Sequence, residues 1–397
     1  MLSSELDYDL PPELIAQEPA SPRDHSRLMH LRRTSGEIAH HRFYELPQLL
    51  RPDDLLVFND TRVLRARLRG FKVSDEAGAV YRGARVEVLL LRERDPNRWE
   101  AMLKPSARLR PGTRLHLVSP DEALQVEAHV VERTSSGWIV QFLGSDIRHA
   151  LPLLGEVPLP PYISTPLHDE NRYQTIYARD KRESDKRESD KRSDAEQAGS
   201  LESAAAPTAG LHFTPQLLDV LQARGIRTAF VTLAIGIGTF RPIKSETLEE
   251  HAMHEEEFEI STSTAQLIHE QKQRGGRIVA VGTTTTRVLE SASDEAGGVQ
   301  AGAGRTSIFI RPGYRFRTVD ALLTNFHLPR STLLAMIAAF AENGDAEIFG
   351  QDRAATSETS TTVGTTLSGL QRIRYAYKQA IAEHYRFFSF GDAMLID

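Results

Sequence analysis

The pattern of hydrophobic and polar positions divides the chain into two kinds of region. Between residues 63 and 143, short segments rich in Val, Leu and Trp alternate with turns that contain Gly, Pro, Asp or Ser. Several short strands at this spacing are typical of a small antiparallel barrel or sandwich. The expected strands are VEVLLLR, RWEAMLK, TRLHLV, LQVEAHVVE and GWIVQFL, and the proline-rich link PLPPYI follows them.

The remaining segments predict strands that alternate with helices. The run DDLLVFND, from Asp53, reads as a short buried strand that ends in polar residues. Thr214 is placed to cap a helix that begins at Pro215 and ends at Gly225, since Thr and Pro favour helix starts and Gly favours helix ends. The expected strands are RTAFVTLAI, RIVAVG, TSIFI and ALLTNF, and the expected helices are STSTAQLIHEQKQ, 331–340 and 370–385.

These patterns predict an α/β protein with an insertion. The length of 397 residues is too great for one ordinary domain. We expect a larger, barrel-like or open α/β domain built from residues 1–61 and 155–397, with a small antiparallel β-barrel inserted at 62–154. Residues 180–205 contain KRESD repeats whose charges nearly cancel, so we expect a solvated linker there. A Thr- and Ser-rich stretch at 346–366 reads similarly.

Composition narrows the function classes. The chain has no cysteine, which excludes disulfides, thiolate metal sites and thiol nucleophiles. The N-terminus lacks a signal pattern, and the longest apolar stretch, 333–340, is far shorter than the roughly 20 residues of a membrane span. We therefore expect a cytoplasmic protein that does not contact membranes. The net charge is −6, but residues 62–154 hold 16 Lys and Arg against 11 Asp and Glu.

Three junctions after strands combine Gly with hydroxyl side chains, a composition suited to binding anions and small ligands. They lie at 207–213, 234–240 and 281–287. Their candidate binding residues are Thr208, Gly210, Gly236, Gly238, Thr239, Thr283, Thr284, Thr285 and Arg287. The glycines of the second junction are only half of a dinucleotide fingerprint, so a tight turn is the alternative there.

Other polar clusters leave their chemistry open. His254 and Glu255 stand in the run HAMHEEEF, where a His beside a Glu suits acid–base work. The spacing is not that of a zinc helix, so no metal is predicted, and a solvated surface remains the alternative. Asp60 and Arg62 follow one strand and His327 follows another, where each could line a site or form a turn.

Taken together, many segments resemble one family. They include LLVFNDTRVLRARL, AAPTAGLHFT, AFVTLAIGIGTFRPI, HAMHEEEFEI, VAVGTTTTRVLES, LLTNFHLPRSTLL and YRFFSFGDAMLI. In this order they resemble the S-adenosylmethionine:tRNA ribosyltransferase-isomerases of queuosine biosynthesis. The resemblance implies transfer and isomerisation of the ribosyl group of S-adenosylmethionine onto 7-aminomethyl-7-deazaguanine at the wobble position of tRNAs with a GUN anticodon. The implied product is epoxyqueuosine, and adenine and methionine are released.

The resemblance also gives the candidate residues roles. His254 with Glu255, and His212, become the candidates for proton transfer, and the residues at the three junctions, with Asp60, Arg62 and His327, become the substrate-binding wall. It implies no metal or redox cofactor and a monomer. The basic inserted barrel is expected to hold tRNA phosphates, with Arg65, Arg67 and Arg69 as the patch tested first.

The sequence departs from the family pattern in two places, and three other functions remain as alternatives. Family members usually carry His where this chain has Ala234, and the KRESD repeat replaces a short link. An RNA methyltransferase would also bind S-adenosylmethionine, but this chain lacks the Gly-rich loop that follows the first strand of such enzymes. A non-catalytic RNA-binding module would use the barrel alone. A base-exchanging transglycosylase would need zinc ligands that a chain without cysteine does not offer.

Overall fold

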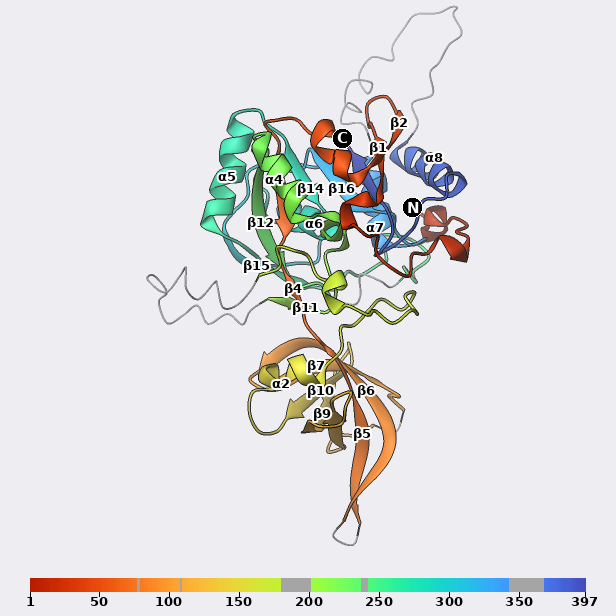
Figure 1. The fold of residues 1–397 in the computed structure, drawn as a ribbon, viewed down its shortest axis with the longest axis vertical. Coiled ribbons are helices and arrows are strands. Elements are labelled where there is room, and N and C mark those ends of the chain that lie inside the picture. The colour runs from red at the N-terminus through yellow and green to blue at the C-terminus, as the bar shows by residue number, and fades with distance from the viewer. Residues whose placement is uncertain (77–78, 108, 180–200, 237–241, 343–367) are drawn as a thin grey trace, which may run out of the picture.

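Two bodies make up the molecule, an α/β domain and a smaller β-barrel beside it (Figure 1). The computed structural model describes residues 1–397 except 77–78, 108, 180–200, 237–241 and 343–367. The predicted linker at 181–194 and the Thr- and Ser-rich stretch at 346–366 lie outside the described residues. Residues 201–205, which the sequence pattern assigned to the linker, belong to the fold: Glu202–Ser203 is a short strand and Ala205 is fully buried.

A nine-stranded mixed sheet forms the centre of the α/β domain. Its order is β15 (Gly302–Thr306), β13 (Glu256–Ile260), β12 (Arg227–Leu233), β3 (Leu55–Asn59), β14 (Ile278–Val281), β16 (Ala321–Asn325), β17 (Ala393–Ile396), β1 (Arg27–Leu31) and β2 (Ile38–Arg42). The four central strands β12, β3, β14 and β16 are parallel, so their carboxyl ends meet at one edge. The predicted α/β class is confirmed, and the strand order shows an open sheet rather than a closed one in this domain.

Helices cover both faces of the sheet because alternate residues of its buried strands point to opposite sides. Leu55 and Val57 of β3 pack in a cluster with α5 (Thr262–Gln273), α6 (Thr283–Ala292), α7 (Thr332–Phe340) and α8 (Gly369–Ala382). Leu56 and Phe58 pack with α1 (Leu46–Leu49) and α4 (Pro215–Ala223) on the other face. The Thr214 hydroxyl accepts from the Leu217 amide, which confirms the predicted cap.

The inserted barrel is closed by six antiparallel strands. Its order is β10 (Trp138–Phe142), β7 (Arg98–Lys104), β6 (Ala79–Asp95), β5 (Arg67–Glu76), β8 (Arg114–Val118) and β9 (Gln125–Arg133). Helix α2 (Ile147–Leu154) follows and packs into the same core. All of these elements lie between residues 62 and 154, and five of the strands match predicted segments. Strand β5 was not predicted, since its charged residues and Gly70 break the hydrophobic run.

The chain enters and leaves the barrel side by side. The Arg67 amide donates to the Glu156 carbonyl (3.1 Å), and the Glu156 amide donates back (2.8 Å). A short parallel pair, β4 (Arg62–Val63) with β11 (Glu202–Ser203), lies next to this junction. Arg65 and Arg69 form ion pairs with Glu170 and Glu156 respectively. These arginines therefore stabilise the junction, and their expected contact with tRNA phosphates stays a prediction.

One predicted strand is wrong. The apolar run TSIFI was expected to be a strand, but β15 ends at Thr306 and Ile308–Ile310 lie beyond it. Ile310 packs against Met336 and Ala339 of α7. The edge strand itself is built from GAGRT, whose small residues suffice because it pairs with β13 on one side. The hydrophobic residues mark a contact with a helix rather than a place in the sheet.

Charged side chains fix the amino ends of the two central strands. Arg277, before β14, donates from Nε and Nη2 to the two oxygens of Asp54, before β3, at 2.8 Å each. Its Nη1 donates to Asp397 at 3.0 Å. Burial alone would raise the pKa of Asp397, but hydrogen bonds from His30 and Arg277 hold it at about 2. Because Asp54 is fully buried, the bidentate pair sets the register of β3 against β14.

Removing the charge of Asp54 should destabilise the α/β domain. We expect Asp54→Asn to lower the free energy of unfolding by about 3 kcal/mol, because it leaves Arg277 without its bidentate carboxylate. Urea unfolding followed by circular dichroism measures the change. The exposed neighbour Asp53→Asn is the matched control and should change stability by less than about 0.5 kcal/mol. Equal effects of the two variants would contradict the assigned role of the pair.

Candidate functional site

The candidate site lies where the carboxyl ends of the four parallel strands meet. Asn59, the last residue of β3, is buried and joins three of these ends. Its Oδ1 accepts from the Thr61 and Leu233 amides, both at 3.1 Å. Its Nδ2 donates to the Leu233 carbonyl (3.3 Å) and to Thr284 Oγ1 (3.4 Å). Asn59 therefore fixes the end of β12 and the start of α6 relative to β3.

A small pocket of about 40 Å³ opens at this edge of the sheet. It has room for about three water molecules. Its walls come from the three predicted junctions, the segment after β16 and the C-terminal segment. The lining residues are Tyr162, Ala206–Ala209, Ile235, Gly282–Thr284, Thr324–Leu328, Leu333, Phe388 and Ser389. None of these side chains carries a permanent charge.

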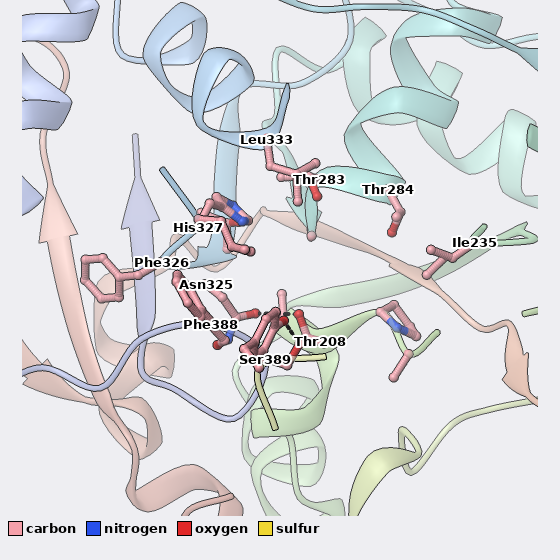
Figure 2. A pocket seen from close by; sticks show the side chains of 17 residues that line it. Thr208, Ile235, Thr283, Thr284, Asn325, Phe326, His327, Leu333, Phe388 and Ser389 are labelled. Atoms are coloured by element: carbon pink, nitrogen blue, oxygen red, sulfur yellow. Dashed lines mark hydrogen bonds between the residues drawn. The ribbon is translucent and has the colours of Figure 1, made fainter. Parts of the chain in front are cut away.

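Two threonines of α6 face this pocket and two do not. Thr283 and Thr284 lie across the pocket from Thr208 and Ser389 (Figure 2). Thr285 and Thr286 instead donate to the carbonyls of Val281 and Gly282, one turn earlier in the chain. Gly282 precedes the helix with a φ of 96°, a conformation that favours glycine. The four threonines at 283–286, of which the first three were predicted as site residues, thus divide into a pair on the pocket and a pair that stabilises the helix start.

Two buried histidines flank the pocket and stay uncharged. His327 lines it, and its Nε2 is 2.8 Å from Thr324 Oγ1. His212 lies behind it, with Nδ1 2.7 Å from Ser26 Oγ and Nε2 3.2 Å from Asn325 Nδ2. Burial lowers the pKa of each imidazole to about 3. Both rings are therefore neutral at physiological pH.

Asn325 connects His212 to the pocket. Its Oδ1 accepts from Thr208 Oγ1 at 3.0 Å, as the dashed line in Figure 2 shows, and its Nδ2 faces His212. On the neighbouring wall, the hydroxyls of Tyr162 and Ser389 are 2.7 Å apart. Asn325, Tyr162 and Ser389 were not predicted as site residues. Asn325 stood inside the quoted run TNFHLP, but nothing in the sequence alone separates a pocket amide from a turn amide.

A much larger cavity, of about 1130 Å³, lies between the α/β domain and the barrel. Its lining shares Ile235 and Leu333 with the small pocket, so the two spaces are neighbours. Barrel residues such as Arg92, Trp99 and Arg148 form one wall. Nine carboxylates line it against five Lys and Arg residues, counted over the part of the chain that is described. The cavity wall is therefore acidic.

A buried ion pair forms part of that wall. Arg287 of α6 and Glu256 of β13 are 4% and 7% exposed, and their side chains pair through Nη1 and Oε2. Glu256 Oε1 also accepts from the Gly236 amide at 3.0 Å. The pair links two of the predicted junctions. Glu256 was not a predicted site residue, because three adjacent glutamates look alike in the sequence.

The predicted proton-transfer pair lies on the same wall. His254 and Glu255 both line the large cavity and are exposed. Glu255 forms a 3.4 Å ion pair with Arg305. They precede the first residue of β13, which leaves their side chains outside the core. Their place on a cavity wall fits the predicted role without testing it.

Several predicted residues lie away from both spaces. Asp60, Arg62, Gly210, His212 and Thr285 line neither. Asp60 is buried and pairs with Arg179 at 3.1 Å. Burial raises the pKa of Asp60, and Arg179 and Thr232 partly offset this rise. Arg62 is exposed on β4. Gly238 and Thr239 lie outside the described residues.

Gly210 has a packing role. A Cβ atom at this position would lie 1.9 Å from the hydroxyl of Tyr177 and 3.0 Å from Thr175 Cγ2. The short helical segment η6 (Thr208–His212) therefore approaches the segment at 173–177 as closely as glycine allows. Gly210 positions Thr208 and His212 on either side of it rather than contacting a ligand.

The described ranges contain neither a metal-binding cluster nor a membrane-spanning helix. In them, no three His, Asp or Glu side chains converge in the way that a metal site requires. No helix of the described chain has the length and apolar character needed to cross a bilayer.

The two neutral histidines should make stability depend on pH. Each has a native pKa below its unfolded value of 6.5, so the unfolded state binds more protons between pH 6.5 and 3. The contribution of the two histidines to the free energy of unfolding is thus fully present above pH 6.5. It falls as the pH is lowered, by up to about 1.4 kcal/mol per pH unit for each histidine. Urea unfolding of wild type and His327→Gln from pH 7.5 to 4.5 tests this. We expect a shallower slope for the variant, and parallel slopes would contradict the assignment.

Gly210→Ala should strain the wall of the pocket. We expect a loss of about 1–3 kcal/mol in unfolding free energy, because the new methyl group meets Tyr177 and Thr175. Tyr177→Phe removes the nearest atom, a buried hydroxyl without a partner in the described chain. The double variant should therefore recover part of the loss. Identical penalties for Gly210→Ala in both backgrounds would place the clash elsewhere.

Comparison with known proteins gives a consistent family. The model of the family described as Queuosine biosynthesis protein matches residues 3–359 and 356–396. A protein of Symbiobacterium thermophilum named S-adenosylmethionine:tRNA ribosyltransferase-isomerase is 44% identical over 397 residues, which is 100% of each chain. A protein of Thermus thermophilus with the same name is 45% identical over 396 residues, 98% of each chain.

A solved structure agrees. The crystal structure of an S-adenosylmethionine tRNA ribosyltransferase from Thermotoga maritima has a TM-score of 0.50 and 33% identity, and the match covers 99% of this chain and 100% of that one. The match includes the α/β domain and the inserted barrel. The chain therefore belongs to the S-adenosylmethionine:tRNA ribosyltransferase-isomerase family of queuosine biosynthesis.

Proposed function

We propose that this enzyme transfers the ribosyl group of S-adenosylmethionine to 7-aminomethyl-7-deazaguanine at the wobble position of tRNA and isomerises it. The product is epoxyqueuosine in tRNAs with a GUN anticodon, and adenine and methionine leave. The observation that carries the proposal is the full-length family match on a chain whose predicted junctions meet in one pocket.

The charges of the two spaces support this substrate pair. The sulfonium of the donor and the aminomethyl group of the acceptor base are both cations at neutral pH. An acidic cavity wall, with nine carboxylates against five Lys and Arg in the described chain, favours cations over phosphates. The small pocket has polar but uncharged walls, which suit the hydroxyl groups of a sugar or the edge of a neutral base. The two spaces therefore suit the charged and the uncharged groups of this substrate pair.

The chemistry needs a base and an acid. A sulfonium acidifies the neighbouring ribosyl carbon, so a positioned base can remove a proton there, and an acid protonates the departing adenine. His254 and Glu255 are the proposed pair, since both line the cavity. His327 stays neutral and forms hydrogen bonds to substrate. His212 does not line the pocket, so we assign it the positioning of Asn325 through its 3.2 Å contact.

The remaining partners follow from the same proposal. No metal or redox cofactor takes part, and S-adenosylmethionine is a substrate. The enzyme acts as a cytoplasmic monomer, and the barrel contributes to tRNA binding. Ala234, at the position where the resemblance led us to expect His, lines the large cavity. We expect the activity to survive this difference because the other residues on the cavity wall remain.

A single-turnover reaction tests the proposed function. The full chain is incubated with S-adenosylmethionine and tRNA that carries 7-aminomethyl-7-deazaguanine, and adenine and the tRNA nucleosides are measured by mass spectrometry. We expect adenine release and the mass increase of an epoxycyclopentanediol on the tRNA, and neither when the modified base is omitted. Methylated tRNA without adenine would instead indicate a methyltransferase. Tight tRNA binding without S-adenosylmethionine binding would indicate a binding module.

The same reaction tests the proton-transfer pair. We expect His254→Gln to slow adenine release by roughly 100-fold or more. His269→Gln, on the exposed face of α5, is the matched control and should leave the rate unchanged. If both variants react at the wild-type rate, His254 takes no part in proton transfer.

A further inference from the structure

Helix α6 joins the small pocket to the large cavity. Thr283 and Thr284, in its first turn, line the pocket, whereas Arg287 lines the cavity. Residues three and four apart lie on the same side of a helix, about 5–6 Å from each other. One face of α6 therefore carries uncharged hydroxyls in one space and a guanidinium in the next. Ile235 and Leu333 belong to both linings and mark the boundary.

One nitrogen of the Arg287 side chain has no hydrogen-bond acceptor in the described chain. Its Nη1 pairs with Glu256, and its Nε donates to the Ile308 carbonyl at 3.4 Å. Its Nη2 is buried and has no acceptor in the described chain. A buried donor without a partner destabilises a protein unless something else supplies the acceptor. Arg287 lines the cavity, so a ligand bound there lies next to this side chain and is the candidate for the missing acceptor.

We infer that Arg287 binds the carboxylate of the amino-acid end of S-adenosylmethionine through Nη2. The inference rests on the proposed function and adds the orientation of S-adenosylmethionine in the site. Its ribose hydroxyls reach into the uncharged pocket beside Thr283 and Thr284, and its charged end remains in the cavity beyond Ile235 and Leu333. Glu256 holds the guanidinium in place from the opposite side.

The surroundings favour this direction over the reverse. A carboxylate placed in the small pocket would meet no cation, because every side chain there is uncharged. An arginine fork is the preferred partner of a carboxylate, and a hydrogen bond between two charged groups is about twice as strong as a neutral one. The α-ammonium of the same amino-acid end would lie near the glutamates at 255–257, which line the cavity beside Arg287. Both charges of the zwitterion thus have partners.

The test compares two ligands and two proteins. Equilibrium binding of S-adenosylmethionine and of decarboxylated S-adenosylmethionine is measured by calorimetry on the full wild-type chain and on Arg287→Gln. We expect wild type to bind S-adenosylmethionine roughly 10- to 100-fold more tightly than the decarboxylated ligand, as for a charged hydrogen bond. We expect Arg287→Gln to reduce this ratio to within about threefold of one. An unchanged ratio in the variant would overturn the inference.

Controls separate binding from folding. Arg287→Gln leaves Glu256 without its partner, so the double variant Glu256→Gln/Arg287→Gln restores a neutral hydrogen-bonded pair and should also show a ratio near one. Arg274→Gln, at the exposed end of α5, should keep the wild-type ratio. A ratio that falls equally in Arg274→Gln would show that net charge rather than contact is responsible, and would overturn the inference.

The outcome also distinguishes this inference from the proposed function. If wild type binds S-adenosylmethionine with the expected ratio but releases no adenine with modified tRNA, the proposed reaction fails and the assignment of Arg287 stands. If adenine is released but Arg287→Gln discriminates between the ligands as wild type does, the reaction stands and the inference fails. If wild type does not bind S-adenosylmethionine, both fail.

Discussion

The hydrogen bonds of Asn59 are the constraint on which the site depends. A parallel sheet brings strand ends to one edge but leaves the loops beyond them free to diverge. Asn59 uses its amide to bind both the N–H and the carbonyl of Leu233 and to contact Thr284 Oγ1. A carboxylate there could accept but could not donate, so an Asp would lose the hydrogen bond to the Leu233 carbonyl. The small pocket has its shape because this one side chain sets the distance between β12 and α6.

Charge separates the site into two spaces with different uses. The pocket is enclosed by hydroxyls, an amide and a neutral imidazole, while ionised groups line the cavity outside it. Burial enforces the division, because a charged group in the pocket would pay a desolvation penalty that no partner offsets. The same burial that keeps His212 and His327 neutral therefore makes the pocket suitable for an uncharged ligand group. The residues proposed for proton transfer are instead the more exposed side chains on the cavity wall.

The sequence predicted the elements better than the contacts between them. Strand β3, the cap at Thr214 and most of the barrel follow from local periodicity and capping, which need no tertiary information. Whether Thr283 or Thr285 reaches a pocket depends on the side of α6 that faces the sheet edge. Likewise, Asn325 and His212 became neighbours only through the fold, since they are 113 residues apart. The family resemblance predicted the function, but it could not distinguish residues that contact a ligand from packing residues such as Gly210.

The three consecutive glutamates at 255–257 have different surroundings because each occupies a different position at the start of β13. Glu255 precedes β13 and is exposed, Glu256 begins the strand and points inward to Arg287, and Glu257 turns back toward Arg92 of the barrel at 3.4 Å. Successive side chains of a strand face opposite sides, so three identical residues receive three environments. The buried one holds a guanidinium in place, and the third joins the two bodies that enclose the cavity. The exposed one, Glu255, is the residue proposed for proton transfer.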